Sequence, residues 1–256
     1  MAAREAQDLM SYPFFSLAKS KRVLPIDFRT GDVTVQVEAT AEHGLATIWD
    51  ADVLIWATSQ IVEAGDAGIR TSRRMVTTPY EILSFIRRGT SSRDYVRLKA
   101  ALDRLQSTSI ATSIRQATAR RLHRFSWINE WKECADARGR PLGLEIILPD
   151  WFYASVIDAA LVLTIDSAYF DLSGGIERWL YRLVRKHAGK QAGGWRFDFR
   201  HLYRKSGSLA RFSDFAVDIR RIVGRQSLPG YRLSLVRSTL RTESLLFRAA
   251  PPSVPA

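Results

Sequence analysis

The sequence has little of what metal, disulfide or membrane chemistry requires. Its 256 residues include a single cysteine, Cys134, which excludes a disulfide framework and a thiolate metal cluster. The four histidines form neither an HxH nor an HExxH pattern, so no zinc-binding motif is present. No apolar run approaches the ~20 residues that a membrane helix needs, and the first residues lack the apolar core of a signal peptide. We expect a cytoplasmic protein with no metal, no cofactor and no membrane contact.

Motifs for covalent catalysis are also missing. No GxSxG nucleophile elbow occurs, and the segment GKQAGG that starts at Gly189 lacks the glycine spacing and the Ser/Thr of a phosphate loop. A DNA-nicking nuclease needs a histidine pair for its metal beside a tyrosine nucleophile, and none of the four histidines has that spacing. We expect that the protein is not an enzyme.

Acidic residues are fewer than basic ones, which gives a formal charge of +12 and a pI of about 10.2. The basic excess is confined to two blocks. Residues 70–124 carry 13 basic and 3 acidic side chains, and residues 178–256 carry 17 and 4. Residues 1–69 and 125–177 are net acidic. Two separated basic blocks predict two anion-contacting surfaces and an internal repeat.

The first half of the chain predicts a β-hairpin followed by three helices. Apolar and polar residues alternate over 23–37 around a Thr-Gly-Asp turn, which is typical of a hairpin. A dense apolar segment, 51–65, predicts a buried helix that is capped by Asp50. Two capping boxes mark the starts of the next two helices: Thr78 with Glu81, and Ser91 with Asp94.

The third of these helices has an apolar side and an arginine side. A helix is ~10 Å wide and fits the major groove of B-DNA, which is about 12 Å wide, and Ala100 amid the arginines permits close approach. The alternative is a solvated face on which the arginines pair with Asp94 and Asp103. We predict that three arginines of this helix contact DNA: Arg93, Arg97 and Arg104.

A basic β-hairpin is predicted after the third helix, from strand 109–115 to strand 121–133. Three helices followed by a basic hairpin is the order of a winged-helix domain. Arginines around the hairpin tip suit contacts with phosphates beside the groove. They are Arg115, Arg120, Arg121 and Arg124, of which Arg121 is the residue we assign to DNA binding.

The second half repeats this order, with a third helix near residue 213 and a final hairpin. Asp214 and Asp218 share the outward face of this helix with arginines, so the charges either pair with one another or face DNA. Asp218 has the further option of accepting from a cytosine amino group. We assign to DNA binding the helix residues Arg220, Arg221 and Arg225 and the hairpin residues Arg232, Arg237 and Arg241.

The predicted fold is therefore α+β, with two tandem winged-helix domains, each a helix-turn-helix plus a β-hairpin wing. The expected organisation is an N-terminal tail at 1–22, a first domain at 23–165, a second domain at 166–249 and a C-terminal tail at 250–256.

Several long segments resemble the plasmid replication initiator protein A family of bacteria. They are FFSLAKSKRVLPIDFR, IWDADVLIWATSQIVEA, TPYEILSFIRRGTSSRDYVRLKAALDRLQST, RFSWINEWKE, LPDWFYASV and GGIERWLYRLVRKHAG. The resemblance implies a non-catalytic initiator that binds iteron-like repeats of double-stranded DNA at a replication origin. It further implies origin opening with a host replication initiator and helicase, and a homodimer when the protein represses its own gene. The alternatives are a winged-helix transcriptional regulator that binds an operator and a nonspecific structural DNA-binding protein.

Overall fold

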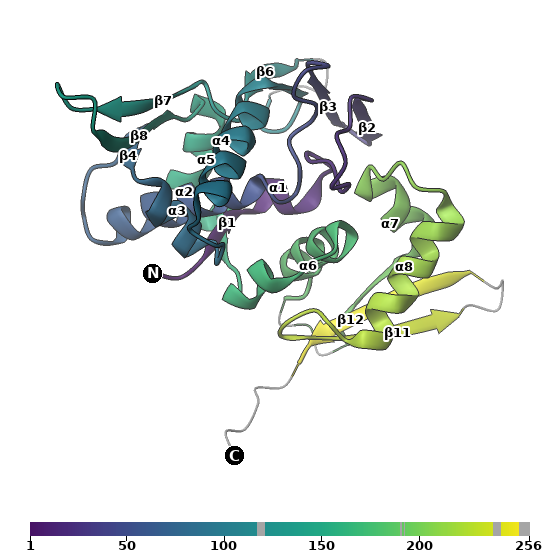
Figure 1. Cartoon of the computed structure of the whole chain (residues 1–256). Coiled ribbons are helices and arrows are strands. Elements are labelled where there is room, and N and C mark those ends of the chain that lie inside the picture. The colour runs from purple at the N-terminus through teal and green to yellow at the C-terminus, as the bar shows by residue number, and fades with distance from the viewer. Residues whose placement is uncertain (117–120, 190, 192, 238–241, 251–256) are drawn as a thin grey trace.

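The computed structural model describes residues 1–116, 121–189, 191, 193–237 and 242–250, and it has a mixed α/β architecture (Figure 1). Two similar units follow one another along the chain. Among the described residues, no helix is both long and apolar enough to cross a membrane.

The first unit, residues 51–147, combines three helices with a three-stranded antiparallel sheet. The sheet order β4-β8-β7 places the last strand of the unit between the other two. Its elements in chain order are α2 (Ala51–Asp66), β4 (Arg74–Thr77), α3 (Pro79–Phe85), α4 (Ser92–Ser107), β7 (Glu130–Ala135) and β8 (Pro141–Ile147).

The second unit, residues 175–249, repeats both the element order and the strand order of the first. Its sheet order is β10-β12-β11, so the last strand again lies in the middle. The elements are α6 (Gly175–His187), β10 (Trp195–Asp198), α7 (Phe199–Ser206), α8 (Phe212–Arg225), β11 (Tyr231–Arg237) and β12 (Glu243–Ala249). The internal repeat that the charge blocks indicated is thus present as a repeat of architecture.

The hairpin predicted after the third helix belongs to a different sheet from the one expected. Strand β5 (Thr108–Thr112) pairs with β3 (Val33–Ala39) as well as with β6 (His123–Ser126), in the order β2-β3-β5-β6 with β2 (Ile26–Thr30) at the edge. The hairpin that packs with β4 is instead β7–β8. Strand β5 joins this sheet because one edge of β3 pairs with β2 and its other edge pairs with β5, which sets Val37 opposite Ile110.

Residues 1–22, which were expected to form a tail, are built into the core. Strand β1 (Arg4–Ala6) pairs with β9 (Val162–Thr164), and α1 (Gln7–Ser11) packs against α6. Phe14 and Phe15 are both buried and contact the ring of Trp127. Burying a side chain of this size contributes about 1.5–3 kcal/mol, so this segment is a structural part of the protein.

The connection between the units runs through short elements. Helix α5 (Asp150–Ile157) packs on α2 and is followed by two 3-10 turns, η1 (Ala159–Leu161) and η2 (Ser167–Asp171), on either side of β9. Helix α6 then lies between the first unit and the rest of the second (Figure 1).

Two buried ion pairs join α6 to the first unit and to the N-terminal segment. Arg178 and Asp52 both have fully buried side chains, and the guanidinium lies 2.7 Å from the carboxylate. Arg88 approaches the same carboxylate at 3.3 Å from the surface side. Arg182 pairs in the same way with Glu5 on β1, with 2% of each side chain exposed. Burial raises the pKa of Asp52 and of Glu5, and their arginine partners oppose that rise.

Further polar contacts reinforce this arrangement. Arg178 also donates to the backbone carbonyls of Phe170 and Leu172, so each nitrogen of its guanidinium has a hydrogen-bond acceptor in the interior. Buried Arg22 donates to the carbonyl of Gly207, which follows α7 in the second unit. At Gly175 a Cβ would lie 1.9 Å from the carbonyl oxygen of Leu17. A glycine is therefore required where α6 begins against the N-terminal segment.

Replacing Arg178 with Met tests the contribution of this interface to stability. The change leaves Asp52 buried with only Arg88 as partner, so we expect the free energy of unfolding to fall by about 3–5 kcal/mol in urea denaturation. The double variant Asp52→Leu/Arg178→Met removes both charges and should recover most of the loss. A loss below about 1 kcal/mol in the single variant would show that the pair does not hold the units together.

Candidate nucleic-acid interface

Helices α3 and α4 meet at a tight elbow that the sequence specifies. Both predicted capping boxes are confirmed: Thr78 accepts from the backbone N–H of Glu81, and Ser91 accepts from that of Asp94. The hydroxyl of Ser91 also donates to the carboxylate of Asp94 at 2.6 Å, which lowers the pKa of Asp94. The elbow therefore presents the first turns of α4 to solvent in a fixed direction.

The arginines expected to share one face of α4 separate into two groups. Arg93 and Arg97 are exposed, and Arg97 makes only a loose contact of 3.4 Å with Asp94. Arg104 instead lies partly buried and donates two hydrogen bonds, of 2.7 and 2.8 Å, to the carboxylate of Asp50. This pairing raises the pKa of Arg104. We revise its role from DNA contact to structural support of α4.

Asp50 also departs from its expected role as a helix cap. It makes no capping hydrogen bond to α2 and accepts instead from the backbone N–H of Thr47, at 2.7 Å. Its side chain is 4% exposed, which explains why it takes a bidentate arginine partner. The carboxylate of Asp103 accepts from the indole of Trp131 at 3.1 Å, and its charge adds weakly to the rise in the pKa of Arg104.

The hairpin β7–β8, which packs with β4, carries its own cations. The turn between β7 and β8 contains Arg138 and Arg140, both exposed, with Arg140 bonded to Asp136 at 2.8 Å. Sequence reasoning missed this turn, although Gly139, which adopts a φ of 75°, is a recognisable turn signal.

The basic residues of the hairpin β5–β6 differ in their exposure and in their contacts. Arg115 lies in the turn that follows β5, but it is not free, because its guanidinium stacks 3.8 Å over the ring of Trp151 and pairs with Asp8 at 3.1 Å. Arg121 and Arg124 are exposed, and Arg120 lies outside the described residues.

In the second unit, α8 has the two faces that its sequence predicted. Phe215, Ile219 and Ile222 are buried, whereas Arg221 and Arg225 are exposed. Arg221 pairs with Asp218 at 2.9 Å, with 55% of the arginine side chain exposed. The pair therefore holds a solvent-facing guanidinium in a defined position.

The hairpin β11–β12 lies beside α8 and shares an ion-pair network with it. Glu243 on β12 accepts from Arg220 of α8 and, at 3.4 Å, from Arg237 of β11. These contacts lower the pKa of Glu243, with Arg220 as the main cause, and they raise the pKa of Arg220. Arg232 is exposed and forms no ion pair with any described residue. Arg241 lies outside the described residues.

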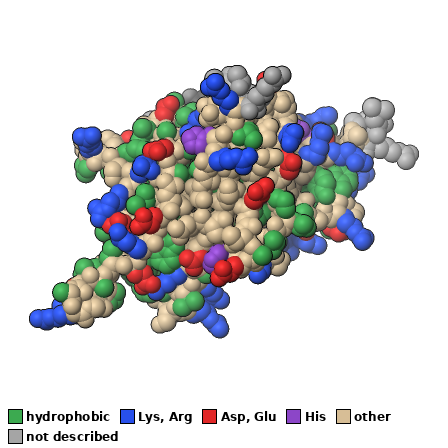
Figure 2. All heavy atoms as spheres, turned by 90° about the horizontal axis from the view of Figure 1, so that it is seen from above, with side chains coloured by type: hydrophobic (Ala, Val, Ile, Leu, Met, Phe, Trp, Pro, Cys, Tyr) green, Lys and Arg blue, Asp and Glu red, His purple; other side chains and the backbone are tan. Residues whose placement is uncertain are grey.

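On one face of the molecule, the basic residues do not merge into one unbroken surface (Figure 2). Figure 2 shows Lys and Arg side chains around much of the periphery of one face, with Asp and Glu between them. Some of the cations are internal, since Arg178 and Arg182 of the second basic block are buried. The described residues contain no group of three His, Cys, Asp or Glu side chains that could hold a metal ion.

These features define a protein with two helix–helix–hairpin units, each of which exposes arginines on its third helix. The chain belongs to the replication initiator protein A family, whose family model matches residues 4–233. It is 31% identical over 228 residues to a protein of Wigglesworthia glossinidia brevipalpis whose name gives it a provisional role in replication, with 88% of this chain and 82% of that protein covered.

Solved structures of domains 2 and 3 of RctB have a similar fold. One superposes with a TM-score of 0.68 at 11% identity, covering 95% of this chain and 98% of the other. A second structure superposes with a TM-score of 0.62 at 12% identity, covering 96% of this chain and 97% of the other. Both units of the chain are thus included in the likeness, and family membership assigns the protein to replication initiation.

The revised role of Arg104 leads to a test that separates stability from binding. Arg104→Ala removes the bidentate partner of Asp50, so we expect the free energy of unfolding to fall by about 1–3 kcal/mol in thermal or urea denaturation. Arg93→Ala, one exposed arginine on the same helix, should leave stability nearly unchanged. Equal stability of the two variants would contradict the structural role.

Proposed function

We propose that the protein is a plasmid replication initiator whose two units are tandem winged-helix domains that bind repeated sites in double-stranded DNA at an origin. The support is the repeated order of helix, strand, two helices and hairpin, with the first strand paired to the last strand in each unit. In this arrangement α4 and α8 are the third helices, the ones that read the major groove in such domains. The domain boundary near residue 165 stays a prediction.

The observation that carries the proposal is the free cationic surface of α8 and its hairpin. Arg221 is held by Asp218, whereas Arg225 and Arg232 form no ion pair with described residues. A helix of 14 residues is ~21 Å long and can lie in the major groove. The second unit then supplies most of the affinity, and Arg93 and Arg97 of the first unit contact an adjacent part of the duplex.

The proposed role is that of a non-catalytic, cytoplasmic protein. Bound at repeated sites, it promotes opening of the origin and recruits a host replication initiator and a helicase. The same DNA contacts suit a dimeric form that represses the protein's own gene. Family membership supports the replication role, and the free arginines support DNA as its ligand.

Substitution of α8 arginines distinguishes base contacts from phosphate contacts. We expect Arg221→Ala to cost about 1–3 kcal/mol of binding free energy and to relax the preference at one base pair. Arg225→Ala should weaken binding to all sequences alike and reduce the salt dependence. Electrophoretic mobility shifts with the DNA that flanks the gene measure both, and Arg29→Ala, on the exposed edge strand β2, is the control. Unchanged affinity in both α8 variants would contradict the proposed interface.

Footprinting on the same DNA separates an initiator from a transcriptional regulator. An initiator should protect several direct repeats, which lie head to tail. A dedicated regulator should protect a palindrome that matches a two-fold dimer. Protection of a palindrome alone would contradict the proposed role at an origin.

A further inference from the structure

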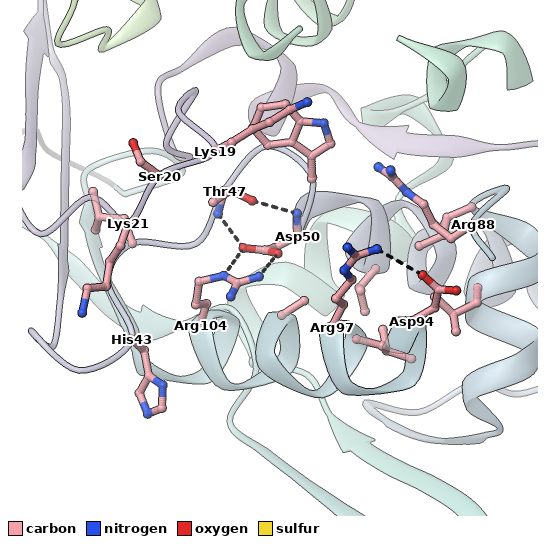
Figure 3. A pocket seen from close by; sticks show the side chains of 17 residues that line it. Lys19, Ser20, Lys21, His43, Thr47, Asp50, Arg88, Asp94, Arg97 and Arg104 are labelled. Carbon is pink, nitrogen blue, oxygen red and sulfur yellow. Dashed lines mark hydrogen bonds and ion pairs between the residues drawn. The ribbon is translucent and has the colours of Figure 1, made fainter. Parts of the chain in front are cut away.

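A groove of about 630 Å³ runs along one flank of α4. Arg97 and Arg104 of α4 lie on one side of it, and Lys19, Ser20 and Lys21 of the N-terminal segment lie across from them (Figure 3). Arg93, one turn before Arg97 on the same side of the helix, does not line the groove. The first unit and the N-terminal segment therefore present two walls to a ligand that approaches α4.

The N-terminal wall is fixed at both ends by backbone hydrogen bonds. Ser16 donates to the carbonyl of Ala46 and accepts from the N–H of Ile48, both at 2.9 Å. At the other end, the carbonyl of Arg22 accepts from Leu45 at 2.8 Å. The loop that carries Lys19 and Lys21 is thus held against residues 45–48, so its cations are positioned before any ligand binds.

The two lysines keep their charge available. Lys21 donates at 3.0 Å to the carbonyl of Ala41, a neutral acceptor, and Lys19 lies 5.5 Å over the ring of Trp49. Neither lysine forms an ion pair with any described residue. The two carboxylates that line the groove are already engaged, Asp50 by Arg104 and Asp94 by Ser91 and Arg97. The groove therefore has an uncompensated positive charge.

Polar and apolar atoms share the exposed surface of the groove about equally. Leu45, Val53 and Leu98 line it but are only 1–3% exposed. These three side chains are already covered and form no open apolar pocket, whereas buried apolar or aromatic anchors normally provide most of the binding energy for a peptide. A ligand that needs cations and hydroxyl groups alone, such as a phosphodiester chain, suits this lining better.

We propose that this groove receives the sugar–phosphate backbone of one DNA strand, with Lys19, Lys21 and Arg97 contacting its phosphates. The inference rests on the proposed function, because a duplex that takes α4 into its major groove places a phosphate strand along the flank of that helix. Lys19 and Lys21 precede the first unit in sequence, and they extend its contact surface beyond the helix and hairpin.

The double variant Lys19→Gln/Lys21→Gln tests this site in the full-length protein. At 0.15 M salt each lost phosphate contact lowers affinity about fivefold, so the double variant should bind the flanking duplex about 25-fold more weakly. The slope of log K against log salt should fall by about 1.8. In ethylation interference, modification of the phosphates contacted by Lys19 and Lys21 should block binding of the wild-type protein. The same modifications should no longer affect binding of the double variant. Lys19→Arg/Lys21→Arg, which retains both charges, should keep the wild-type slope.

Lys99→Gln is the matched control. It removes a lysine from α4 itself, but that lysine pairs with Glu133 at 2.8 Å and does not line the groove. It should change affinity less than twofold. A double variant that retains both affinity and slope would overturn the proposal. So would a variant that keeps DNA binding but loses binding to a polyglutamate peptide, since the groove would then accept an acidic protein segment.

The outcomes distinguish this inference from the proposed function. If wild-type protein shows no salt-dependent binding to duplex DNA, the proposed function itself fails. If wild-type protein binds and Arg221→Ala weakens it while the lysine variants bind normally, only the groove assignment fails.

Discussion

The relative placement of the two units depends on two arginines of α6, which reach carboxylates of the first unit and of the N-terminal segment in the core. Arg178 and Arg182 lie one turn apart on α6, and their partners Asp52 and Glu5 belong to α2 and β1. A buried charge that loses its partner is costly, so sliding or rotation of α6 is opposed until both pairs break together. The orientation of the exposed face of α8 relative to that of α4 follows from this constraint.

The remaining cations differ in whether a partner within the protein engages their charge. A chain with a formal charge of +12 would bind polyanions diffusely if every arginine faced solvent. Instead, Arg104 supports α4 through Asp50, and Arg115 stacks on Trp151. Several of the cations that remain free or loosely held, among them Arg93, Arg97 and Arg225, lie on the third helices. Net charge alone therefore overstates the size of the contact surface and hides its location.

Much of the fold was predictable because it is specified locally. The capping boxes at Thr78 and Ser91 depend on residues three apart, and the two faces of α8 follow from helical periodicity. The assignment of strands to sheets was not predictable in the same way. The pairing of β5 with β6, its neighbour in the chain, was expected. The pairing of β5 with β3 was not, because it joins residues some 70 positions apart. Such pairings are set by tertiary packing.

The buried arginines show a second limit of sequence reasoning. Nothing in the residues of α6 separates Arg178 from the exposed arginines of α8, because the distinction lies in a carboxylate more than 120 residues away. Arg104 was assigned to DNA for the same reason, since its partner Asp50 precedes another helix. Lys19 and Lys21 were missed because they lie in a segment that was expected to be a tail.

A spacing experiment tests most directly whether the fixed arrangement acts on one duplex. Once hydroxyl-radical footprinting defines the stretches that the two units protect, insertion of about 5 bp between them turns one stretch by half a helical turn. With the units fixed through α6, affinity should fall to that of the second unit's contacts alone, and a 10 bp insertion should also fail to restore the wild-type value because of the added length. Unchanged affinity and unchanged protection of both stretches after the 5 bp insertion would contradict the account.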